Sequence, residues 1–386
     1  MVLCVLAATQ ALLAVRLLAR LVATAGGESV RREMAPQDGH IALVLPVLNE
    51  HRRIDACLES ARAETGEVIE ILVVDGGSTD GTPDRVRRQA ALDPRVRLVD
   101  ASPVPPTWTG KAWGLAVGAA RATPGADWLL CIDADVRLAP LLARSLLAHA
   151  RRQSLDALSV AARQRLPGAA DGVVHPALLA TLVYRFGMPG HATRDVHRVQ
   201  ANGQCFLVRR RVLERSGALA AARDSLCEDV TIARRIAETG VPVGFYEAGD
   251  LVETAMYAGW RETWRNWPRS LPMRDRYFGW QGAVGLVEVA LVQALPAPLL
   301  ALALLTGGPG WIVVLAGALA ATRLGVLAGM RRAYARPPWT YWLSPLCDLP
   351  AAAGLVASAV RRRHRWRDRT YVRRRDGGFA LEEVTS

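Results

Sequence analysis

The feature that most constrains this fold is the alternation of short apolar runs with helical stretches between residues 41 and 257. The apolar runs are rich in Val, Ile and Leu and too short for ordinary helices, so they are typical of buried strands. We expect strands at 41–47, 69–74, 95–99, 128–132 and 205–208, and helices at 52–64, 82–91, 111–122, 139–151 and 228–239. This order predicts an α/β domain whose mainly parallel sheet is covered by helices on both faces.

Polar motifs stand where these strands end. The first strand runs into Pro-Val-Leu-Asn-Glu at 46–50, the second ends in Asp-Gly-Gly-Ser-Thr-Asp at 75–80, and the fourth is followed by Asp133-Ala-Asp135. Ligands of parallel α/β sheets bind beyond the carboxyl ends of the strands. Two carboxylates at a strand tip favour a hard cation, Mg²⁺ or Mn²⁺. Each motif alone is compatible with an ordinary turn and helix cap.

Two more positions carry possible chemistry. Lys111 is the single lysine among 48 basic residues, and it follows Gly110 at the start of a helix, where it could meet a phosphate. A solvated lysine at a helix start is the alternative. Glu228 and Asp229 open another helix, where acidic residues also occur simply because they stabilise the helix dipole.

The order and spacing of these motifs over residues 40–260 resemble the family 2 glycosyltransferases. The resemblance implies a GT-A fold, one nucleotide-diphospho-sugar transferase domain that uses a sugar nucleotide and a divalent metal. It also implies a donor pocket, a metal ligand and a general base. By this resemblance, Pro46, Glu50, Asp75, Lys111 and Asp133 would bind the donor, and Asp135 would hold the metal. Asp229 would be the base, with Glu228 as a supporting or acceptor contact, and Asn202, Gly203 and Gln204 would lie in the acceptor pocket.

The predicted reaction is an inverting transfer of one hexose, from a donor expected to be a UDP-sugar. Processive synthases of the family carry Gln-x-x-Arg-Trp, which this sequence lacks, so we expect a single sugar to be transferred. Within the family, the tracts at 108–111, 201–204 and 228–229 are most similar to hopanoid-associated and carotenoid glycosyltransferases, which use apolar isoprenoid acceptors. Two alternatives stay open: a polyprenyl-phosphate sugar synthase, and a membrane scaffold that binds a nucleotide without catalysis.

Apolar segments flank the α/β region. Residues 2–24 are followed by Arg31 and Arg32, which places the amino terminus outside and the α/β domain in the cytosol; a surface amphipathic helix is the alternative. Segments 283–305 and 310–330 are long enough to cross a bilayer of roughly 30 Å. Three crossings would leave the carboxyl terminus outside, against the positive-inside rule, so we expect one segment, 341–360, not to cross fully.

Charge and cysteine content narrow the remaining choices. The formal net charge is +12, and nine arginines fall within 361–375 beside an apolar segment, which favours contact with anionic lipid rather than nucleic acid. The six scattered cysteines form no metal or disulfide pattern. We therefore expect a multi-pass protein of the cytoplasmic membrane. Its predicted parts are a transmembrane helix at 1–24, the catalytic domain at 40–257, an interfacial segment at 258–282, transmembrane segments at 283–360 and a basic cytosolic tail at 361–386.

Overall fold

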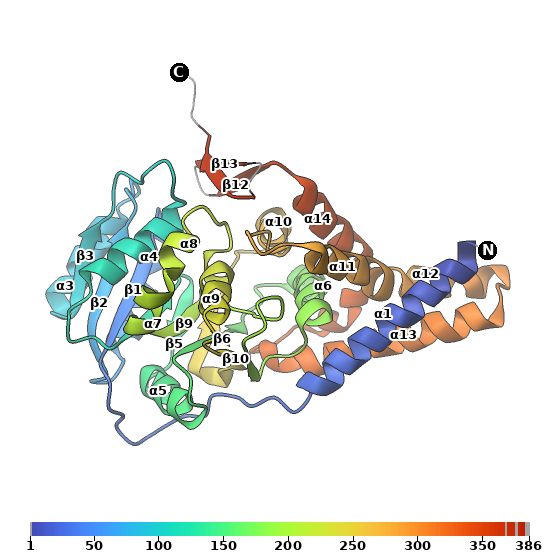
Figure 1. Ribbon diagram of the computed structural model, residues 1–386, viewed down its shortest axis with the longest axis horizontal. Coiled ribbons are helices and arrows are strands. Elements are labelled where there is room, and N and C mark those ends of the chain that lie inside the picture. The colour runs from blue at the N-terminus through green and yellow to red at the C-terminus, as the bar shows by residue number, and fades with distance from the viewer. Residues whose placement is uncertain (1, 367–368, 375–376, 383–386) are drawn as a thin grey trace.

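The computed structural model describes residues 2–366, 369–374 and 377–382, and its centre is an eight-stranded sheet in the order β3-β2-β1-β4-β9-β6-β10-β8 (Figure 1). The strands are β1 (Ile41–Val47), β2 (Val68–Asp75), β3 (Val96–Asp100), β4 (Trp128–Ile132), β6 (Ala157–Ala161), β8 (His191–Thr193), β9 (Cys205–Arg209) and β10 (Val243–Glu247). Strands β1 to β4 are parallel, whereas β9 runs antiparallel to both β4 and β6. The predicted mainly parallel sheet is confirmed, and all five predicted strands form.

Helices cover both faces of this sheet, as predicted. One face carries α2 (Ile54–Arg62), α3 (Thr82–Leu92) and α5 (Leu142–Arg152). The other carries α4 (Gly110–Arg121), α7 (Arg210–Ser216), α8 (Ala218–Ala221) and α9 (Glu228–Glu238). Each face buries an aliphatic cluster because β1, β2 and β4 are apolar on both sides, the pattern expected of interior parallel strands. A small second sheet is formed by β5 (Val136–Leu138), β11 (Val252–Thr254) and β7 (Arg163–Gln164), with η1 (Gly249–Leu251) before β11.

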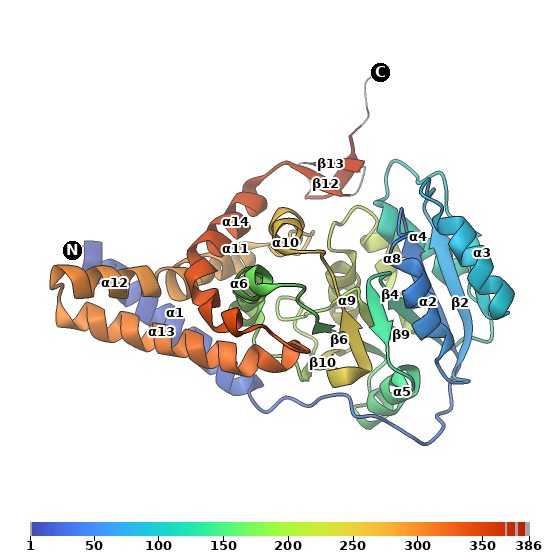
Figure 2. The same cartoon turned by 180° about the vertical axis from the view of Figure 1, so that it is seen from behind.

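Among the described residues, four helical segments are apolar and long enough to cross a membrane, namely Val5–Thr24, Trp280–Thr306, Gly310–Ala333 and Trp339–Val360. They comprise α1 (Val2–Thr24), α11 (Trp280–Glu288), the π-helical η3 (Val289–Ala294), α12 (Pro296–Thr306), α13 (Gly310–Met330), η4 (Arg331–Ala333), η5 (Trp339–Cys347) and α14 (Asp348–Val360). The segment 341–360, which we predicted not to cross fully, changes from a 3-10 helix to an α-helix at Asp348. The amino-terminal end of α1 and the α12–α13 connection lie together at the far end of the molecule, whereas α14 lies closer to the α/β domain (Figures 1 and 2).

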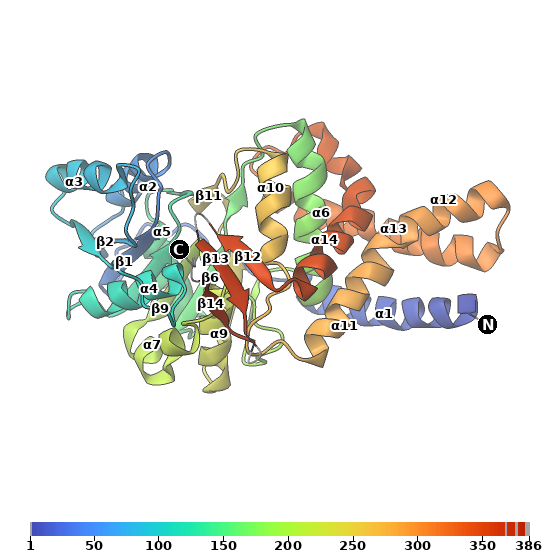
Figure 3. The same ribbon diagram turned by 90° about the horizontal axis from the view of Figure 1, so that it is seen from above.

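Helix α6 (Ala169–Phe186) lies between the α/β domain and these apolar helices, and the sequence analysis did not single it out. In the predicted interfacial segment, α10 (Trp260–Asn266) and η2 (Trp267–Arg269) pack beside it (Figure 3). Trp267 is buried and stacks on His175 of α6 with ring centroids 4.3 Å apart, whereas Trp260 is exposed. This segment contains Trp260, Trp264 and Trp267, and packing on the rest of the protein accounts for at least the last of them.

Several charged side chains within the apolar helices are paired, as buried charges generally are. Arg323 of α13 binds Asp348 of α14 through Nε and Nη2 at 2.7 and 2.9 Å, and Gln293 of η3 donates to the same carboxylate at 2.9 Å. Arg20 of α1 binds Glu288 of α11 at 2.8 Å. These contacts connect the four apolar segments to one another.

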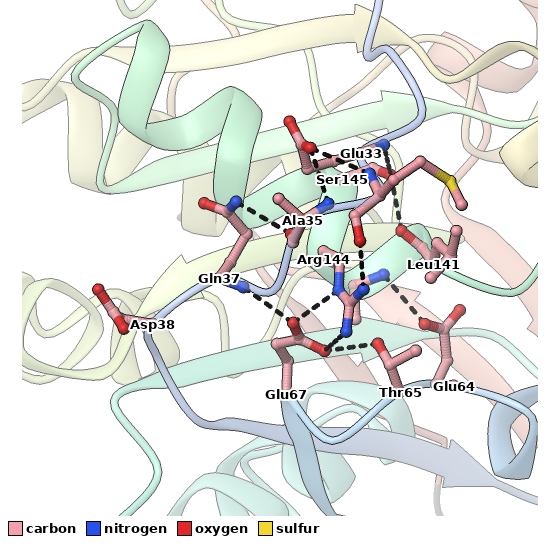
Figure 4. Close-up of polar contacts among 12 residues, drawn as sticks. Glu33, Ala35, Gln37, Asp38, Glu64, Thr65, Glu67, Leu141, Arg144 and Ser145 are labelled. Atoms are coloured by element: carbon pink, nitrogen blue, oxygen red, sulfur yellow. Dashed lines mark hydrogen bonds and ion pairs between the residues drawn. The ribbon is translucent and has the colours of Figure 1, made fainter.

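The linker between α1 and β1 is fastened to the side of the α/β domain where β1 and β2 begin, which we call its back (Figure 4). The backbone N–H of Glu33 donates to the Ser145 hydroxyl at 2.9 Å. The Gln37 N–H donates to Glu67 at 3.0 Å, and Arg144 binds the same carboxylate at 2.8 Å. We call Glu64, Glu67, Arg144 and Ser145 the back cluster.

The carboxyl-terminal region is not a free tail where it is described. It forms a three-stranded antiparallel sheet of β12 (Arg363–Trp366), β13 (Arg369–Arg373) and β14 (Phe379–Leu381), which lies over the α/β domain (Figure 3). Within the predicted basic tail, backbone pairing between the strands and contacts with the domain order an arginine-rich segment. Arg367 and Arg375 of the predicted cluster lie outside the described residues.

Candidate active site

A cavity of about 990 Å³ lies beyond the carboxyl ends of β1 and β4, where the sequence placed the site. Most of the predicted residues line it: Pro46, Glu50, Lys111, Asp133, Asp135, Asn202, Gln204, Glu228 and Asp229. Asp75 and Gly203 stand just behind its wall. Residues far apart in the sequence meet here because parallel strands bring their carboxyl ends to one edge of the sheet.

The loops after β1 and β2 hold each other in place. Asn49 has a φ of 54°, a left-handed conformation that Asn tolerates, and its side-chain oxygen accepts the Thr79 N–H at 2.9 Å. Asp75 accepts the N–H groups of Gly77 and Ser78 at 3.2 and 3.0 Å. The carboxylate predicted to line the nucleoside pocket therefore braces its own loop, and Gly76 takes its place on the cavity wall.

Lys111 crosses from α4 to two carboxylates. Helix α4 can approach β1 closely because Gly118 has no side chain, and a Cβ there would come within 2.3 Å of Val44 Cγ1. Lys111 Nζ lies 2.8 Å from Asp133 Oδ1 and 2.8 Å from Glu228 Oε1. Burial alone would lower the pKa of Lys111, but the surrounding carboxylates outweigh it and raise this pKa well above its usual value.

Asp229 lies beside this pair at the start of α9. Its Oδ2 accepts the Gly203 N–H at 2.6 Å, and its Oδ1 accepts the Val230 N–H at 2.8 Å. Burial, and then the charge of Glu228, raise the pKa of Asp229 to about 6, although Lys111 opposes them. A carboxyl group with that pKa is ionised at neutral pH and a stronger base than an exposed aspartate.

Gly203 is needed for its small size. A Cβ at this position would lie 2.5 Å from Lys111 Nζ and 3.3 Å from Asp229 Oδ2. The residue predicted to bind the acceptor therefore positions the lysine and the base from behind.

The neighbours of Gly203 form a small amide network. Asn202 donates from its side chain to Gln204 Oε1 at 2.8 Å, and Gln204 reaches the Thr254 hydroxyl at 3.4 Å. The Asn202 N–H is held by the Ser159 hydroxyl at 2.8 Å. Ser159 and Thr254 were not predicted, because nothing in a lone serine or threonine within a strand distinguishes it.

Asp135 is the least satisfied group of the site. Its Oδ1 is buried and has no hydrogen-bond partner among the described residues. Burial and the nearby Asp133 raise its pKa to about 7. A buried carboxylate oxygen without a donor is costly unless a proton or a cation occupies the space beside it.

The sequence analysis missed the rest of the cavity wall. An apolar side is formed by Leu179, Leu182 and Val183 of α6, with Met256, Leu271, Met273 and Met330. A basic side is formed by Arg361, His364 and Arg369 near or within the carboxyl-terminal sheet, with Arg269 of η2. The arginine run was visible in sequence, but only the fold shows that part of it faces the cavity.

Comparison with known proteins agrees with this arrangement. Residues 42–217 match the family model described as Glycosyl transferase family 2. The chain is 39% identical over 93 residues to the succinoglycan biosynthesis protein ExoA of Rhizobium meliloti (strain 1021), covering 24% of this chain and 27% of that protein. It is 34% identical over 112 residues to ExoO of the same organism, covering 28% of this chain and 29% of that protein. The chain thus spans less than a third of each of these relatives.

One solved structure resembles almost the whole chain. It is the mannosyltransferase PcManGT from Pyrobaculum calidifontis, in complex with GDP-Man and Mn²⁺, with a TM-score of 0.52 and 21% identity over 92% of this chain and 98% of that one. At this identity the likeness concerns the fold. The chain therefore has a GT-A α/β fold, residues 42–217 are similar to the family 2 glycosyl transferase domain, and the matches support a glycosyltransferase.

Proposed function

We propose that this protein is a membrane-bound glycosyltransferase that moves one sugar from a nucleoside-diphosphate donor to an apolar lipid acceptor. The observation that carries the proposal is a single cavity whose wall has two unlike parts. One part of its wall holds Lys111, Asp133, Asp135 and Asp229. Another part is apolar and comes from α6, from the loops that carry Met256, Leu271 and Met273, and from Met330 of α13. A sugar nucleotide suits the first part, and an isoprenoid of the hopanoid or carotenoid kind suits the second.

Asp229 acts as the base in this proposal. It takes the proton of the acceptor hydroxyl while that oxygen attacks the anomeric carbon, and the bond from this carbon to the diphosphate breaks on the opposite face. The sugar is inverted, and the nucleoside diphosphate leaves with the electron pair. The N–H groups of Gly203 and Val230 hold the carboxylate in place, and its pKa of about 6 keeps it ionised at neutral pH.

Lys111 and Glu228 set the electrostatics around the base. The ammonium group lies between Asp133 and Glu228, which orients it toward the donor end of the cavity. Its positive charge stabilises the ionised form of Asp229. Pro46 and Glu50 line the same end, where we propose the nucleoside binds.

The residues present fit a divalent cation at Asp135, because its Oδ1 is buried without a hydrogen-bond donor. Among the described residues, no three His, Cys, Asp or Glu side chains are grouped to hold a metal. An ion would therefore take its other ligands from donor phosphates and water, as Mg²⁺ commonly does. When bound, it would offset the negative charge of the departing diphosphate. PcManGT, which shares the fold, is a complex with GDP-Man and Mn²⁺.

We further propose that α1, the α11–α12 segment and α13 cross the membrane, and that residues 339–360 stay on the side of the α/β domain. The carboxyl-terminal sheet touches this domain, since the Gly110 N–H donates to Tyr371 at 3.2 Å. Residues 257 and 361 therefore lie on one side, which requires an even number of crossings between them. The shared far end of α1 and the α12–α13 connection supports the same arrangement (Figure 2). It leaves the arginines after residue 360 in the cytosol, as the positive-inside rule requires.

The decisive experiment measures nucleoside-diphosphate release by the detergent-purified full chain. UDP- and GDP-sugars are offered with Mn²⁺ or Mg²⁺, with and without an isoprenoid lipid extract. Lipid-dependent release from one donor is expected, with loss of release in Asp135→Asn and retention in the control Asp84→Asn, whose side chain is 70% exposed on α3. Folded protein that releases nothing from any donor would leave only a nucleotide-binding scaffold.

A further inference from the structure

The carboxyl-terminal sheet makes several contacts with the loops around the cavity. Arg369 Nη2 donates to the carbonyl oxygen of Gly76 at 3.0 Å, next to the loop that Asp75 braces. The Phe379 N–H donates to the carbonyl of Asp224 at 2.9 Å, and Arg374 binds the Asp224 carboxylate at 2.6 Å. Together with the Gly110–Tyr371 contact, these bonds fix the sheet at the mouth of the cavity, above the amino-terminal end of α4.

The side chains that this region presents to the cavity are cationic. Arg361, His364 and Arg369 line it, joined by Arg269, whose Nη1 donates to the Arg365 carbonyl at 2.7 Å. Burial lowers the pKa of His364, and the charges of Arg269, Arg361 and Arg373 lower it further against the effect of a hydrogen bond with the Arg361 carbonyl. The mouth thus carries a local excess of positive charge.

Another part of the same cavity wall is anionic. Asp133 and Glu228 pair with the ammonium group of Lys111 there, and Asp135 and Asp229 lie beside them. The transferred hexose and an alcohol acceptor are neutral, so phosphoryl groups are the anionic parts of the proposed ligands that these guanidinium groups can meet. Guanidinium groups recognise phosphoryl oxygens through paired, charge-assisted hydrogen bonds.

We propose that the carboxyl-terminal sheet is part of the ligand site, where Arg369 and Arg361 bind phosphoryl oxygens of a ligand in the cavity. The proposal rests on the function proposed above for the nature of that ligand. Two sources share the chemistry: the diphosphate of the sugar donor, and a phosphate on an isoprenoid acceptor. Arg369 is held next to the Gly76 loop, whereas Arg361 directly follows α14, so the two residues sample different parts of the mouth.

The first test measures binding of UDP, GDP and inorganic pyrophosphate to the full chain in detergent by calorimetry, with uridine and guanosine as comparison ligands. Arg369→Gln and Arg361→Gln are compared with the control Arg363→Gln. Arg363 belongs to β12, is 74% exposed and pairs with Glu382 at 2.7 Å. Loss of one charged hydrogen bond should weaken diphosphate binding about tenfold to a hundredfold and leave nucleoside binding unchanged. Arg369→Lys, which keeps the charge, should lose less.

The second test measures capture of vesicles of phosphatidylcholine with and without an isoprenyl phosphate. A defect confined to nucleoside diphosphates assigns the phosphoryl group to the donor, and a defect confined to isoprenyl phosphate assigns it to the acceptor. If folded Arg369→Gln and Arg361→Gln match the Arg363→Gln control in both tests, the proposal is overturned. Native protein that binds pyrophosphate but no nucleotide would contradict the proposed function while leaving this site intact.

Discussion

The back cluster and the active site both bury carboxylates beside a cation, and they differ in how the charges balance. In the back cluster, Arg144 faces Glu67, and although burial raises the pKa of Glu67, hydrogen bonds from Arg144 and other donors lower it to about 2. Neighbouring Glu64 has no cation, and burial raises its pKa to about 7. This cluster therefore holds two carboxylates beside one arginine, and the arginine pairs with Glu67 (Figure 4).

In the active site, one lysine faces Asp133, Glu228 and Asp229, and Asp135 stands close by. The pKa values of Asp135 and Asp229 are raised, to about 7 and about 6. Excess buried carboxylate attracts protons or cations. The back cluster has a small excess, since Glu64 Oε1 is also buried without a partner among the described residues, whereas four carboxylates gather around one lysine in the active site. The comparison teaches that buried charge alone does not indicate function in this chain; the size of the carboxylate excess separates the two clusters.

The largest expected effect is that of Asp229→Asn. The amide cannot accept the proton of the acceptor hydroxyl, so turnover should fall about 10²- to 10⁴-fold, while the Gly203 N–H keeps an acceptor oxygen. Nucleoside-diphosphate release measures the rate, and the thermal unfolding midpoint should not fall. Nearly normal activity would instead favour a polyprenyl-phosphate acceptor, which is already an anion and needs no base.

Gly203→Ala should have the next largest effect. The new Cβ would displace Lys111 Nζ, which it would approach to 2.5 Å, and misplaced catalytic groups cost about tenfold to a hundredfold in rate. The matched control is Gly66→Ala beside Glu67, where no atom lies within 4 Å of the added carbon. Equal activity of the two variants would break the distinction between the two clusters.

The dependence of rate on pH should follow Asp229. Because the base works only when deprotonated, kcat/KM should be constant above a pH of about 6 and fall about tenfold for each pH unit below it. A Glu67→Gln variant should keep the same profile, since its carboxylate lies outside the site. A profile displaced in that variant would show that the clusters are coupled.

Glu67→Gln should have the smallest effect on activity and a clear one on stability. It leaves Arg144 buried without its ionised partner, which costs about 3 kcal/mol of unfolding free energy. Because the pKa of Glu67 is lowered by folding, its stabilisation is present above pH 4.5 and is lost as the pH falls toward about 2. Thermal unfolding of both proteins across this range measures the difference, which should vanish at the acid end; a constant difference would contradict the pairing.

The sequence predicted five of the eight strands of the central sheet, and most of the site residues that it predicted line the cavity. This worked because strand ends in a parallel sheet must share one edge, so motifs far apart in sequence could be brought together without knowing the packing. The precise functions of Asp75 and Gly203 were less predictable, since they depend on which neighbour a carboxylate faces and on how close Lys111 passes.

The carboxyl-terminal sheet could not be foreseen for a different reason. An arginine-rich segment has low intrinsic preference for strands, and β12 to β14 form through pairing with one another and contacts with Asp224 and Gly110. Helix α6 was missed because its importance comes from its position between the domain and the apolar helices. In both cases tertiary contacts, rather than local pattern, decide the structure.

Lys111 is the only lysine in a chain of 386 residues, and it lies at the centre of the cavity's charged wall. Reagents that methylate amines therefore have one side-chain target in this chain, in addition to the α-amino group. Reductive methylation with ¹³C-formaldehyde keeps the positive charge and would add a single side-chain resonance to the spectrum. The chain thus carries, without any mutation, a position at which isotope labelling reports directly on what enters its active site.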